Sequence, residues 1–303
     1  MAKMTARRKD LMGRTERTVF ITGCSSGIGL ASAMRFAARG YRVIATARQV
    51  EALHDLESVA IRNNWSLRIS ACDVASEDSV ASSIDFAHQG FGPVHILVNN
   101  AGYGLIGPVE LVPLSEARRQ LEVNTLAPIR LAQFVIPDMR AAGWGRIINV
   151  SSIAGRISIP FGGWYSASKF ALESLSAALR LELEPYGIKT IAIEPGPVRT
   201  RFIENTQLAP TETDLRPEYG ALYHAYQMRR ASNRSFEISA ETVAGVIVHA
   251  AETRRPKPRY VLTLPARAGV LAMRFLSDRM MERAIRMFYG LGRWQRAAQS
   301  EFP

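Results

Sequence analysis

The stretch TVFITGCSSGIGLASAMRFAA, residues 18–38, points to the fold class. It passes from a short apolar run, through a loop with Gly23, Gly27 and Gly29, into apolar residues at helical spacing. Glycine allows close backbone approach, and the first turn of a helix offers free N–H groups to a pyrophosphate. A merely tight strand-to-helix turn is the simpler alternative, but this position in the chain favours dinucleotide binding.

The rest of the central chain alternates β-rich apolar runs with stretches of helical period, a pattern typical of βαβ units. Strands are expected at 18–22, 41–46, 66–72, 95–99, 146–150, 189–193 and 259–263, and helices at 28–39, 79–89, 115–139, 165–184 and 240–252. We therefore predict an α/β fold: a single doubly wound Rossmann domain with a seven-stranded parallel sheet and helices on both faces.

The net charge of +11 on 303 residues resembles that of a nucleic-acid-binding protein, but its distribution does not. Residues 1–17 carry six basic and two acidic side chains, and residues 253–296 carry eleven and two. Residues 18–252 are almost neutral, with 21 basic and 22 acidic side chains. The basicity therefore belongs to the two ends, and nucleic acid is not the expected partner.

The same reading divides the chain into three parts. We expect a basic arm over 1–17, a catalytic domain over 18–264 with a lid at 201–236, and a basic helical extension over 265–303. No secretory signal or membrane-spanning run is visible, and the two cysteines suit a reducing compartment, so a cytoplasmic protein is expected. The five histidines lack metal-ligand spacing, so no metal is expected.

The second expected strand ends in Ala47-Arg48, where an NAD site usually carries an acid for the ribose 2′-OH. Arginine suits the 2′-phosphate of NADP, so NADP(H) is favoured over NAD, although a surface arginine is the plain alternative. Asp73-Val74, after the third strand, could cap the next helix or contact the adenine.

Tyr165 and Lys169 share one face of an expected helix, one turn apart. An ammonium beside a phenol favours phenolate and lowers the tyrosine pKa, as a general acid/base requires. Ser152 ends an expected strand nearby in the sequence, and Asn124 lies inside an expected helix, where its amide has no local use.

Together these motifs resemble the short-chain dehydrogenase/reductase family. TGCSSGIG, Asn99 to Gly102, Asn124, Ser151-Ser152, Tyr165 with Lys169, and Glu194-Pro195-Gly196-Pro197-Val198 match it in order and spacing. VIATAR, NAGYGLIGPVE, YSASKFALESL and PKPRY look like the branch of estradiol 17β-hydroxysteroid dehydrogenase type 1 and the retinol dehydrogenases.

The resemblance implies a role for each matching residue. Tyr165 would exchange the proton with the substrate oxygen, Ser152 would hold that oxygen, and Lys169 would bind the nicotinamide ribose. Asn124 would hold a water that links Lys169 to solvent. The implied cofactor residues are Thr22, Gly23, Ser25, Ser26, Gly27, Ile28, Gly29, Arg48, Asp73, Val74, Asn100, Ala101, Gly102, Tyr165, Lys169, Pro195, Gly196, Val198 and Thr200.

The lid is rich in apolar and aromatic residues, so we expect an apolar alcohol or ketone as substrate: a steroid, a retinoid or a long-chain carbonyl compound. The expected substrate-site residues are Ser152, Tyr165, Tyr103, Ile153, Phe161, Tyr223 and His224. Within enzymes, a 3-oxoacyl thioester reductase is the alternative. A non-catalytic NADPH-sensing regulator is the rival from another class, and the intact Tyr165 and Lys169 count against it.

Residues 270–288 can be drawn as one amphipathic helix with arginines on its polar side. Its apolar side would carry Val270, Met273, Leu276, Met280, Ala284 and Met287. The helix either packs on its own domain or a partner, or contacts the inner face of a membrane as a peripheral anchor. The resemblance also implies a homodimer or homotetramer built on the helices at 115–139 and 165–184.

Overall fold

The fold is described by a computed structural model that covers residues 13–202, 204–209, 217–232 and 237–289. Its main sheet has seven parallel strands, in the order β11-β7-β6-β4-β1-β2-β3. They are β1 (Thr18–Ile21), β2 (Arg42–Ala47), β3 (Leu67–Ala71), β4 (Val94–Asn99), β6 (Gly145–Val150), β7 (Ile188–Glu194) and β11 (Arg259–Val261). The order reverses between β1 and β4, and ligands of such sheets bind at the carboxyl ends beside this reversal. The predicted doubly wound sheet is confirmed.

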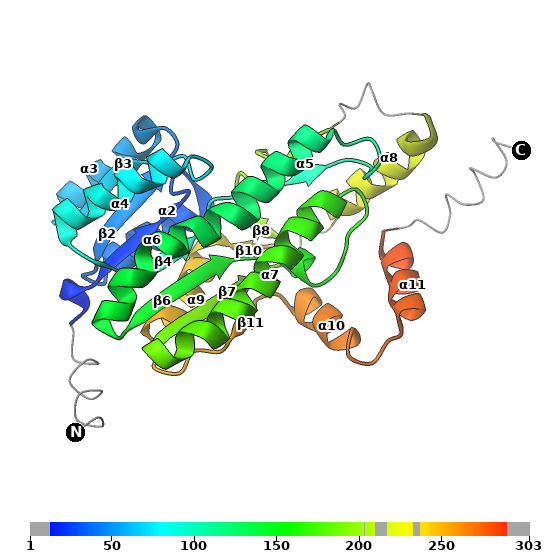
Figure 1. The fold of residues 1–303 in the computed structure, drawn as a ribbon. Coiled ribbons are helices and arrows are strands. Elements are labelled where there is room, and N and C mark those ends of the chain that lie inside the picture. Colours follow the sequence, from blue (N-terminus) through cyan, green and yellow to red (C-terminus); the bar gives the residue numbers. More distant parts are fainter. Residues whose placement is uncertain (1–12, 203, 210–216, 233–236, 290–303) are drawn as a thin grey trace, which may run out of the picture.

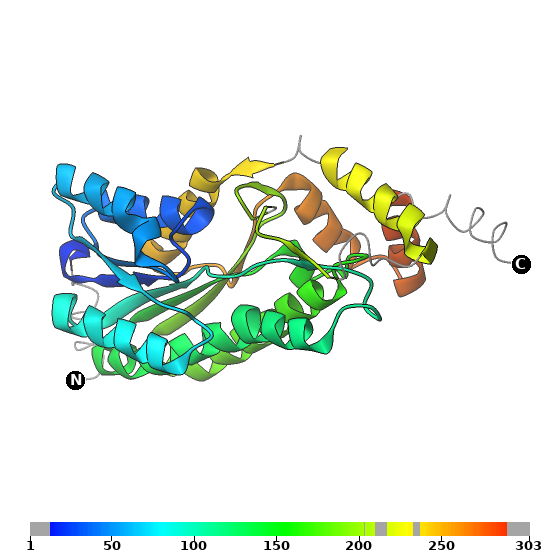
Figure 2. The same cartoon turned by 90° about the horizontal axis from the view of Figure 1, so that it is seen from above.

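Helices cover both faces of the sheet (Figures 1 and 2). One face carries α2 (Gly27–Ala37), α3 (His54–Arg62) and α9 (Ala240–Glu252). The other carries α4 (Glu77–Phe91), α5 (Leu114–Leu121), α6 (Ala127–Ala142) and α7 (Gly163–Leu183). A π-helical turn, Glu122–Leu126, joins α5 to α6, so the single helix expected over 115–139 is irregular at its centre. The sequence analysis did not predict α3.

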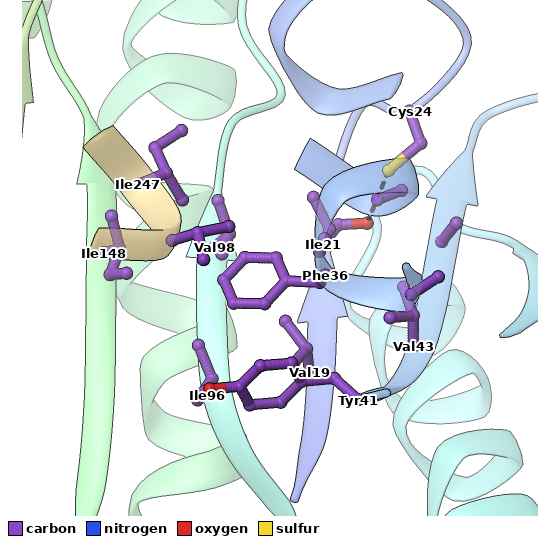
Figure 3. Packing of buried hydrophobic residues seen from close by; sticks show 14 of the residues in the cluster. Val19, Ile21, Cys24, Phe36, Tyr41, Val43, Ile96, Val98, Ile148 and Ile247 are labelled. Atoms are coloured by element: carbon purple, nitrogen blue, oxygen red, sulfur yellow. Dashed lines mark hydrogen bonds between the residues drawn. The ribbon is translucent and has the colours of Figure 1, made fainter. Parts of the chain in front are cut away.

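The two layers of the core explain why the strands are continuous apolar runs. Val19 and Ile21 point to the α2–α9 side, whereas Phe20 packs on the α4–α6 side. On the first side, Phe36 and Tyr41 meet edge to face, with ring centroids 5.2 Å apart. Figure 3 shows both rings among the aliphatic side chains of neighbouring strands. Because helices cover both faces of the sheet, every residue of β1 is buried.

Shorter elements lie beyond the carboxyl ends of the sheet. Two small parallel pairs join β5 (Leu105–Ile106) to β9 (Gln207–Leu208) and β8 (Val198–Arg199) to β10 (Ile238–Ser239). Three helices follow: α8 (Pro217–Ser232), α10 (Leu264–Ala272) and α11 (Asp278–Phe288). Figure 1 shows all three on the side to which β6 and β7 point. Short 3-10 turns occur at Arg14–Glu16, Val50–Leu53, Ile153–Gly155 and Glu184–Tyr186.

The expected single helix over 270–288 is two helices, α10 and α11. The chain bends between them, and the extended backbone of Ser277 (φ −67°, ψ 161°) starts α11. Met280 and Met287, placed on the inner side by the sequence, are 54% and 71% exposed. Ala284 is partly buried as expected, but Met281 and Ile285 are the partly buried residues beside it on α11. Within the described residues no helix is long and apolar enough to cross a membrane.

Candidate active site

The loop between β1 and α2 is held against the end of β4 by close backbone contacts. A Cβ on Gly29 would lie 2.2 Å from the carbonyl oxygen of Gly23, so only glycine fits there. Thr22 Oγ1 accepts hydrogen bonds from the backbone N–H groups of Asn100 and Ala101, both at 3.0 Å. Ser26, which starts α2, makes no side-chain cap bond. The first-turn N–H groups are therefore uncapped by that side chain, as an anion site requires.

Beside this loop lies a cleft of about 730 Å³ at the carboxyl edge of the sheet. Apart from Thr22 and Gly29, every residue predicted for the cofactor lines it. Thr22 and Gly29 are buried and shape the loop from beneath. Phe202 and Tyr226, from the expected lid, and Ser151 and Pro197, from the matched motifs, line it as well. The remaining lining residues were not predicted from the sequence: Ala47, Cys72, Val123, Val150, Ala154, Ile159, Glu204, Asn205, Thr206, Gln207, Glu237 and Tyr289.

At the adenine end that the resemblance implies, Arg48 is exposed at the rim of the cleft and Ala47 is buried. Asp73 also lines the cleft, and its Oδ1 accepts a hydrogen bond from the backbone N–H of Ala75 at 3.1 Å. The cap of α4 is Ser76, whose side chain accepts from the N–H of Ser79. Of the two roles considered for Asp73, capping α4 is therefore wrong.

Ser152, Tyr165 and Lys169 meet on the floor of the cleft. Tyr165 stands in the first turn of α7, beside Ser152, which follows β6 and whose hydroxyl favours the Tyr165 phenolate. Lys169 is one turn further along α7; its Nζ donates to the carbonyl oxygen of Val150 at 2.9 Å. The same Nζ lies 5.9 Å from the centroid of the Tyr165 ring. The structure thus brings three of the four predicted catalytic residues together, with Lys169 bonded to the backbone.

Burial shifts the pKa values of both groups against their charged forms. It raises the pKa of Tyr165 to about 12, and the Ser152 hydrogen bond offsets only part of this effect. It lowers the pKa of Lys169 to about 8, against the opposing influence of Glu173. The sequence led us to expect that Lys169 would lower the tyrosine pKa. In this structure that shift has the opposite direction, because burial penalises the phenolate more than its neighbours stabilise it.

Asn124 lies in the π-helical turn, a feature that often marks functional sites. Its side chain is buried and makes two hydrogen bonds to the backbone of Tyr103. Oδ1 accepts from the backbone N–H of Tyr103 at 3.2 Å, and Nδ2 donates to the backbone carbonyl oxygen of Tyr103 at 3.0 Å. Nδ2 also donates to Ser168 Oγ on α7 at 3.2 Å. Asn124 does not line the cleft; its side chain ties the Tyr103 segment to α7.

The predicted substrate residues separate into two groups. Tyr103 and Ile153 line the cleft, whereas Phe161, Tyr223 and His224 do not. Phe161 has a left-handed backbone (φ 58°), and its ring lies 5.6 Å from that of Tyr223. Both belong to an aromatic cluster under α8. His224 is exposed on α8. Leu215 and Phe236, two apolar residues of the lid expected at 201–236, lie outside the described residues.

The C-terminal extension reaches the cleft. Tyr289, directly after α11, lines it and stacks on Tyr226 of α8, with ring centroids 5.8 Å apart. The sequence offered only the adjacent aromatic pair Phe288-Tyr289 as a signal, and this pair has no periodicity that would indicate a contact with α8.

A buried ionic cluster lies at the carboxyl end of β7, next to α7. Arg259 Nε is 2.9 Å from Glu173 Oε2 and 3.2 Å from Glu194 Oε1, and Arg156 Nη1 is 3.5 Å from the same Glu194 oxygen. Burial, reinforced by the neighbouring Glu173, raises the pKa of Glu194 to about 7, although Arg156 and Arg259 oppose this shift. The sequence analysis gave these residues no role.

With this geometry in place, the comparisons with known proteins identify the family. The model of the short chain dehydrogenase family matches residues 17–210. This chain belongs to the short-chain dehydrogenase family. The predicted family resemblance is therefore confirmed, and the family is one of oxidoreductases.

Several relatives resemble this short-chain dehydrogenase over most of their length. An uncharacterized oxidoreductase of Escherichia coli K12, YbbO, is 34% identical over 89% of this chain and 94% of its own. Human 17-beta-hydroxysteroid dehydrogenase type 1 is 36% identical over 83% of this chain and 78% of its own. Bovine retinol dehydrogenase 8 is 35% identical over 82% of both chains.

Solved structures of other short-chain dehydrogenases and oxidoreductases have a similar fold. A short-chain dehydrogenase from Streptomyces avermitilis has a TM-score of 0.78 at 28% identity, covering 96% of this chain and 100% of its own. A metagenomic short-chain oxidoreductase in complex with NADP has a TM-score of 0.66 at 27% identity, covering 82% and 96%. A short-chain dehydrogenase from Burkholderia phymatum in complex with NAD has a TM-score of 0.75 at 25% identity, covering 90% and 97%.

The raised pKa of Glu194 predicts a pH-dependent stability difference. Its pKa in the folded chain, about 7, exceeds the ordinary 4.5, so proton uptake stabilises the fold fully below pH 4.5. That contribution is lost as the pH rises through 7. A Glu194→Gln variant carries no such proton, so its free energy of unfolding should rise relative to wild type between pH 5 and pH 8. Urea unfolding at both pH values measures this.

The matched control is Glu182→Gln, which changes an exposed glutamate on α7. Its difference from wild type should be the same at both pH values. A constant difference for Glu194→Gln as well would contradict the assigned shift.

Proposed function

We propose that this short-chain dehydrogenase is an NADP(H)-dependent oxidoreductase that interconverts an alcohol and a ketone or aldehyde on an apolar substrate. The observation that carries the proposal is the meeting of Ser152, Tyr165 and Lys169 on the floor of the cleft that the glycine loop also lines. A proton donor, an oxygen-binding hydroxyl and a dinucleotide cradle therefore share one enclosed space.

In the direction of reduction, Tyr165 donates its hydroxyl proton to the carbonyl oxygen of the substrate. A pKa of about 12 keeps the phenol protonated at neutral pH, the state that donation requires. The Ser152 hydroxyl donates a hydrogen bond to the same oxygen and orients it. Lys169 stabilises the phenolate that remains. The dinucleotide, when bound, supplies or accepts the hydride.

The residues around the glycine loop fit a dinucleotide. Gly23 and Gly29 leave no room for a Cβ, so the backbone presents a cradle, and the N–H groups of α2 suit a pyrophosphate. Exposed Arg48 has no acidic partner among the described residues and follows a small buried residue where NAD sites usually carry an acid. Both features favour the 2′-phosphate of NADP.

The opposite end of the cleft supports an apolar substrate. Ile153, Ile159, Phe202, Tyr226 and Tyr289 line it. Tyr103 also lines the cleft, and its buried hydroxyl has no hydrogen-bond partner among the described residues. The names of the human and bovine relatives, a hydroxysteroid and a retinol dehydrogenase, agree with a steroid, a retinoid or a long-chain carbonyl compound.

Exposed apolar side chains on the helices of the second sheet face, which carries α4 to α7, support self-association. Leu126 of the π-helical turn is 50% exposed, and on α7 Phe170, Leu175 and Leu181 are 41%, 37% and 75% exposed. Leu172, by contrast, is buried and belongs to the core. We infer a homodimer or homotetramer that covers this apolar face.

The extension supports contact with an anionic membrane surface. Leu271, Phe275, Met280 and Met287 are 57%, 79%, 54% and 71% exposed. Five exposed arginines accompany them over 264–288, against two acidic residues: Arg267, Arg274, Arg279, Arg283 and Arg286. Exposed apolar and cationic side chains together suit an anionic lipid surface, where apolar substrates also partition. We propose peripheral attachment through α10 and α11.

Turnover should require the Tyr165 hydroxyl. With NADPH and a panel of ketosteroids, retinal and long-chain aliphatic ketones, wild type should reduce at least one compound. Tyr165→Phe should lose about 100-fold or more of that rate, because general-acid catalysis contributes roughly that much, while still binding NADPH. The control Tyr186→Phe changes a tyrosine that is 45% exposed and should be fully active. Full activity of Tyr165→Phe, or turnover of small polar sugars alone, refutes the proposal.

Arg48 should decide the choice of dinucleotide. Arg48→Ala should weaken NADPH binding by about 10-fold or more, the worth of one charge-assisted hydrogen bond. NADH affinity should stay unchanged, since NADH lacks the 2′-phosphate. Fluorescence titration measures both constants. Arg62→Ala, at an exposed position on α3, is the control. Equal weakening for both dinucleotides would contradict the assignment.

Membrane attachment is tested by flotation of the full chain with phosphatidylglycerol vesicles. Wild type should float at low salt and be released by high salt, and phosphatidylcholine vesicles should not carry it. The double variant Phe275→Ser, Met287→Ser should not bind the vesicles and should stay at the bottom of the gradient. Ile61→Ser, at a 75% exposed site on α3, should float like wild type. Flotation of the double variant, or none of the wild type, rejects the attachment.

A further inference from the structure

Glu173 lies one helical turn after Lys169 and two turns after Tyr165 on α7, so the three side chains share one face. It is 4% exposed, and Lys169 is 6% exposed. The turn that follows Ser152 packs directly on this pair: a Cβ on Gly155 would lie 3.0 Å from Glu173 Cγ and 3.0 Å from the Lys169 carbonyl oxygen. Glu173 and Lys169 are therefore enclosed together under the Ser152 segment.

The groups that face Lys169 include only one carboxylate among the described residues. Tyr165 and Glu173 come from its own helix, Val150 offers a backbone carbonyl from β6, and the amide of Asn124 lies beyond Gly102. A buried ammonium with neutral neighbours loses its proton readily, since a low dielectric penalises charge. Glu173 is the residue that raises the pKa of Lys169 against this effect.

Glu173 is itself held by a cation from the edge strand β11. Arg259 Nε is 2.9 Å from Glu173 Oε2, while Glu173 Oε1 has no hydrogen-bond partner among the described residues. The other charged groups facing this carboxylate are Glu194, Arg180 and, through Glu194, Arg156. The ion pair with Arg259 therefore fixes the Glu173 carboxylate on the face of α7 that also carries Lys169.

We propose that Glu173 is a positioning residue: its carboxylate keeps Lys169 protonated beside Tyr165, and Arg259 holds that carboxylate in place. The inference rests on the proposed function, in which Lys169 acts as an ammonium. Without Glu173, a larger fraction of Lys169 is neutral at neutral pH, and its support for the Tyr165 phenolate is lost.

The protonation of Lys169 can be measured directly, because the chain has five lysines. With lysine labelled at 13Cε, the signals of the full chain titrate with pH in an NMR spectrum, and Lys169→Arg assigns the signal of interest. In wild type its midpoint should be near pH 8. In Glu173→Gln it should fall by about one unit. Glu182→Gln, an exposed site on the same helix, should leave it unchanged. An unchanged midpoint in Glu173→Gln overturns the proposal.

Two further variants separate charge from shape. Glu173→Asp retains the carboxylate and should keep the midpoint closer to wild type than Glu173→Gln does. If Glu173→Gln does not fold, Glu173→Ala replaces it, because it too removes the carboxylate, and an unchanged midpoint in that variant overturns the proposal. The titration needs neither cofactor nor carbonyl compound. Absence of turnover therefore speaks against the proposed function, whereas an unmoved midpoint speaks only against Glu173.

Discussion

A chain of buried hydrogen bonds connects the sheet to α7, and the geometry of the site depends on it. Asn99, at the end of β4, donates to Asn149 Oδ1 on β6 at 2.8 Å. Asn149 donates in turn to Ser176 Oγ on α7 at 2.8 Å, and Ser176 donates to the carbonyl of Leu172. A buried amide left without its partner costs about 1–3 kcal/mol. A shift of α7 along the sheet would break these bonds, so the helix has one stable position.

That position decides how Tyr165 and Lys169 meet the residues that follow β6. Lys169 reaches back to the carbonyl of Val150, and Gly155 lets the turn after Ser152 approach the Lys169 backbone. The site thus combines a hydrogen-bonded helix with a tightly packed turn. Burying a phenol and an ammonium here opposes the charged form of each, and such opposed shifts are typical of acid/base sites. The same packing that excludes water makes Lys169 dependent on a nearby carboxylate.

The sequence was sufficient for the parallel sheet and for most of the cofactor end of the cleft. Both depend on local patterns: continuous apolar strands, glycines in the first loop, and the one-turn spacing of Tyr165 and Lys169. It did not predict α3, nor the π-helical turn at Asn124, because a turn of five residues is too short for apolar periodicity to distinguish from α-helix. The direction of the Tyr165 pKa shift was also wrong, since burial depends on surrounding segments that spacing along one helix cannot reveal.

The substrate end was predicted less well because it is built by segments far apart in the chain. Phe161 has a left-handed backbone and packs under α8, whereas Tyr289 stacks on Tyr226 and lines the cleft. The cofactor end is thus shaped by the geometry of a doubly wound sheet, whereas the other end receives Tyr226 from α8 and Tyr289 from the residue that follows α11. Since Tyr289 directly follows α11 and stacks on Tyr226 of α8, the position of α11 helps to set the wall of the cleft, a contact between segments that no local sequence pattern reveals.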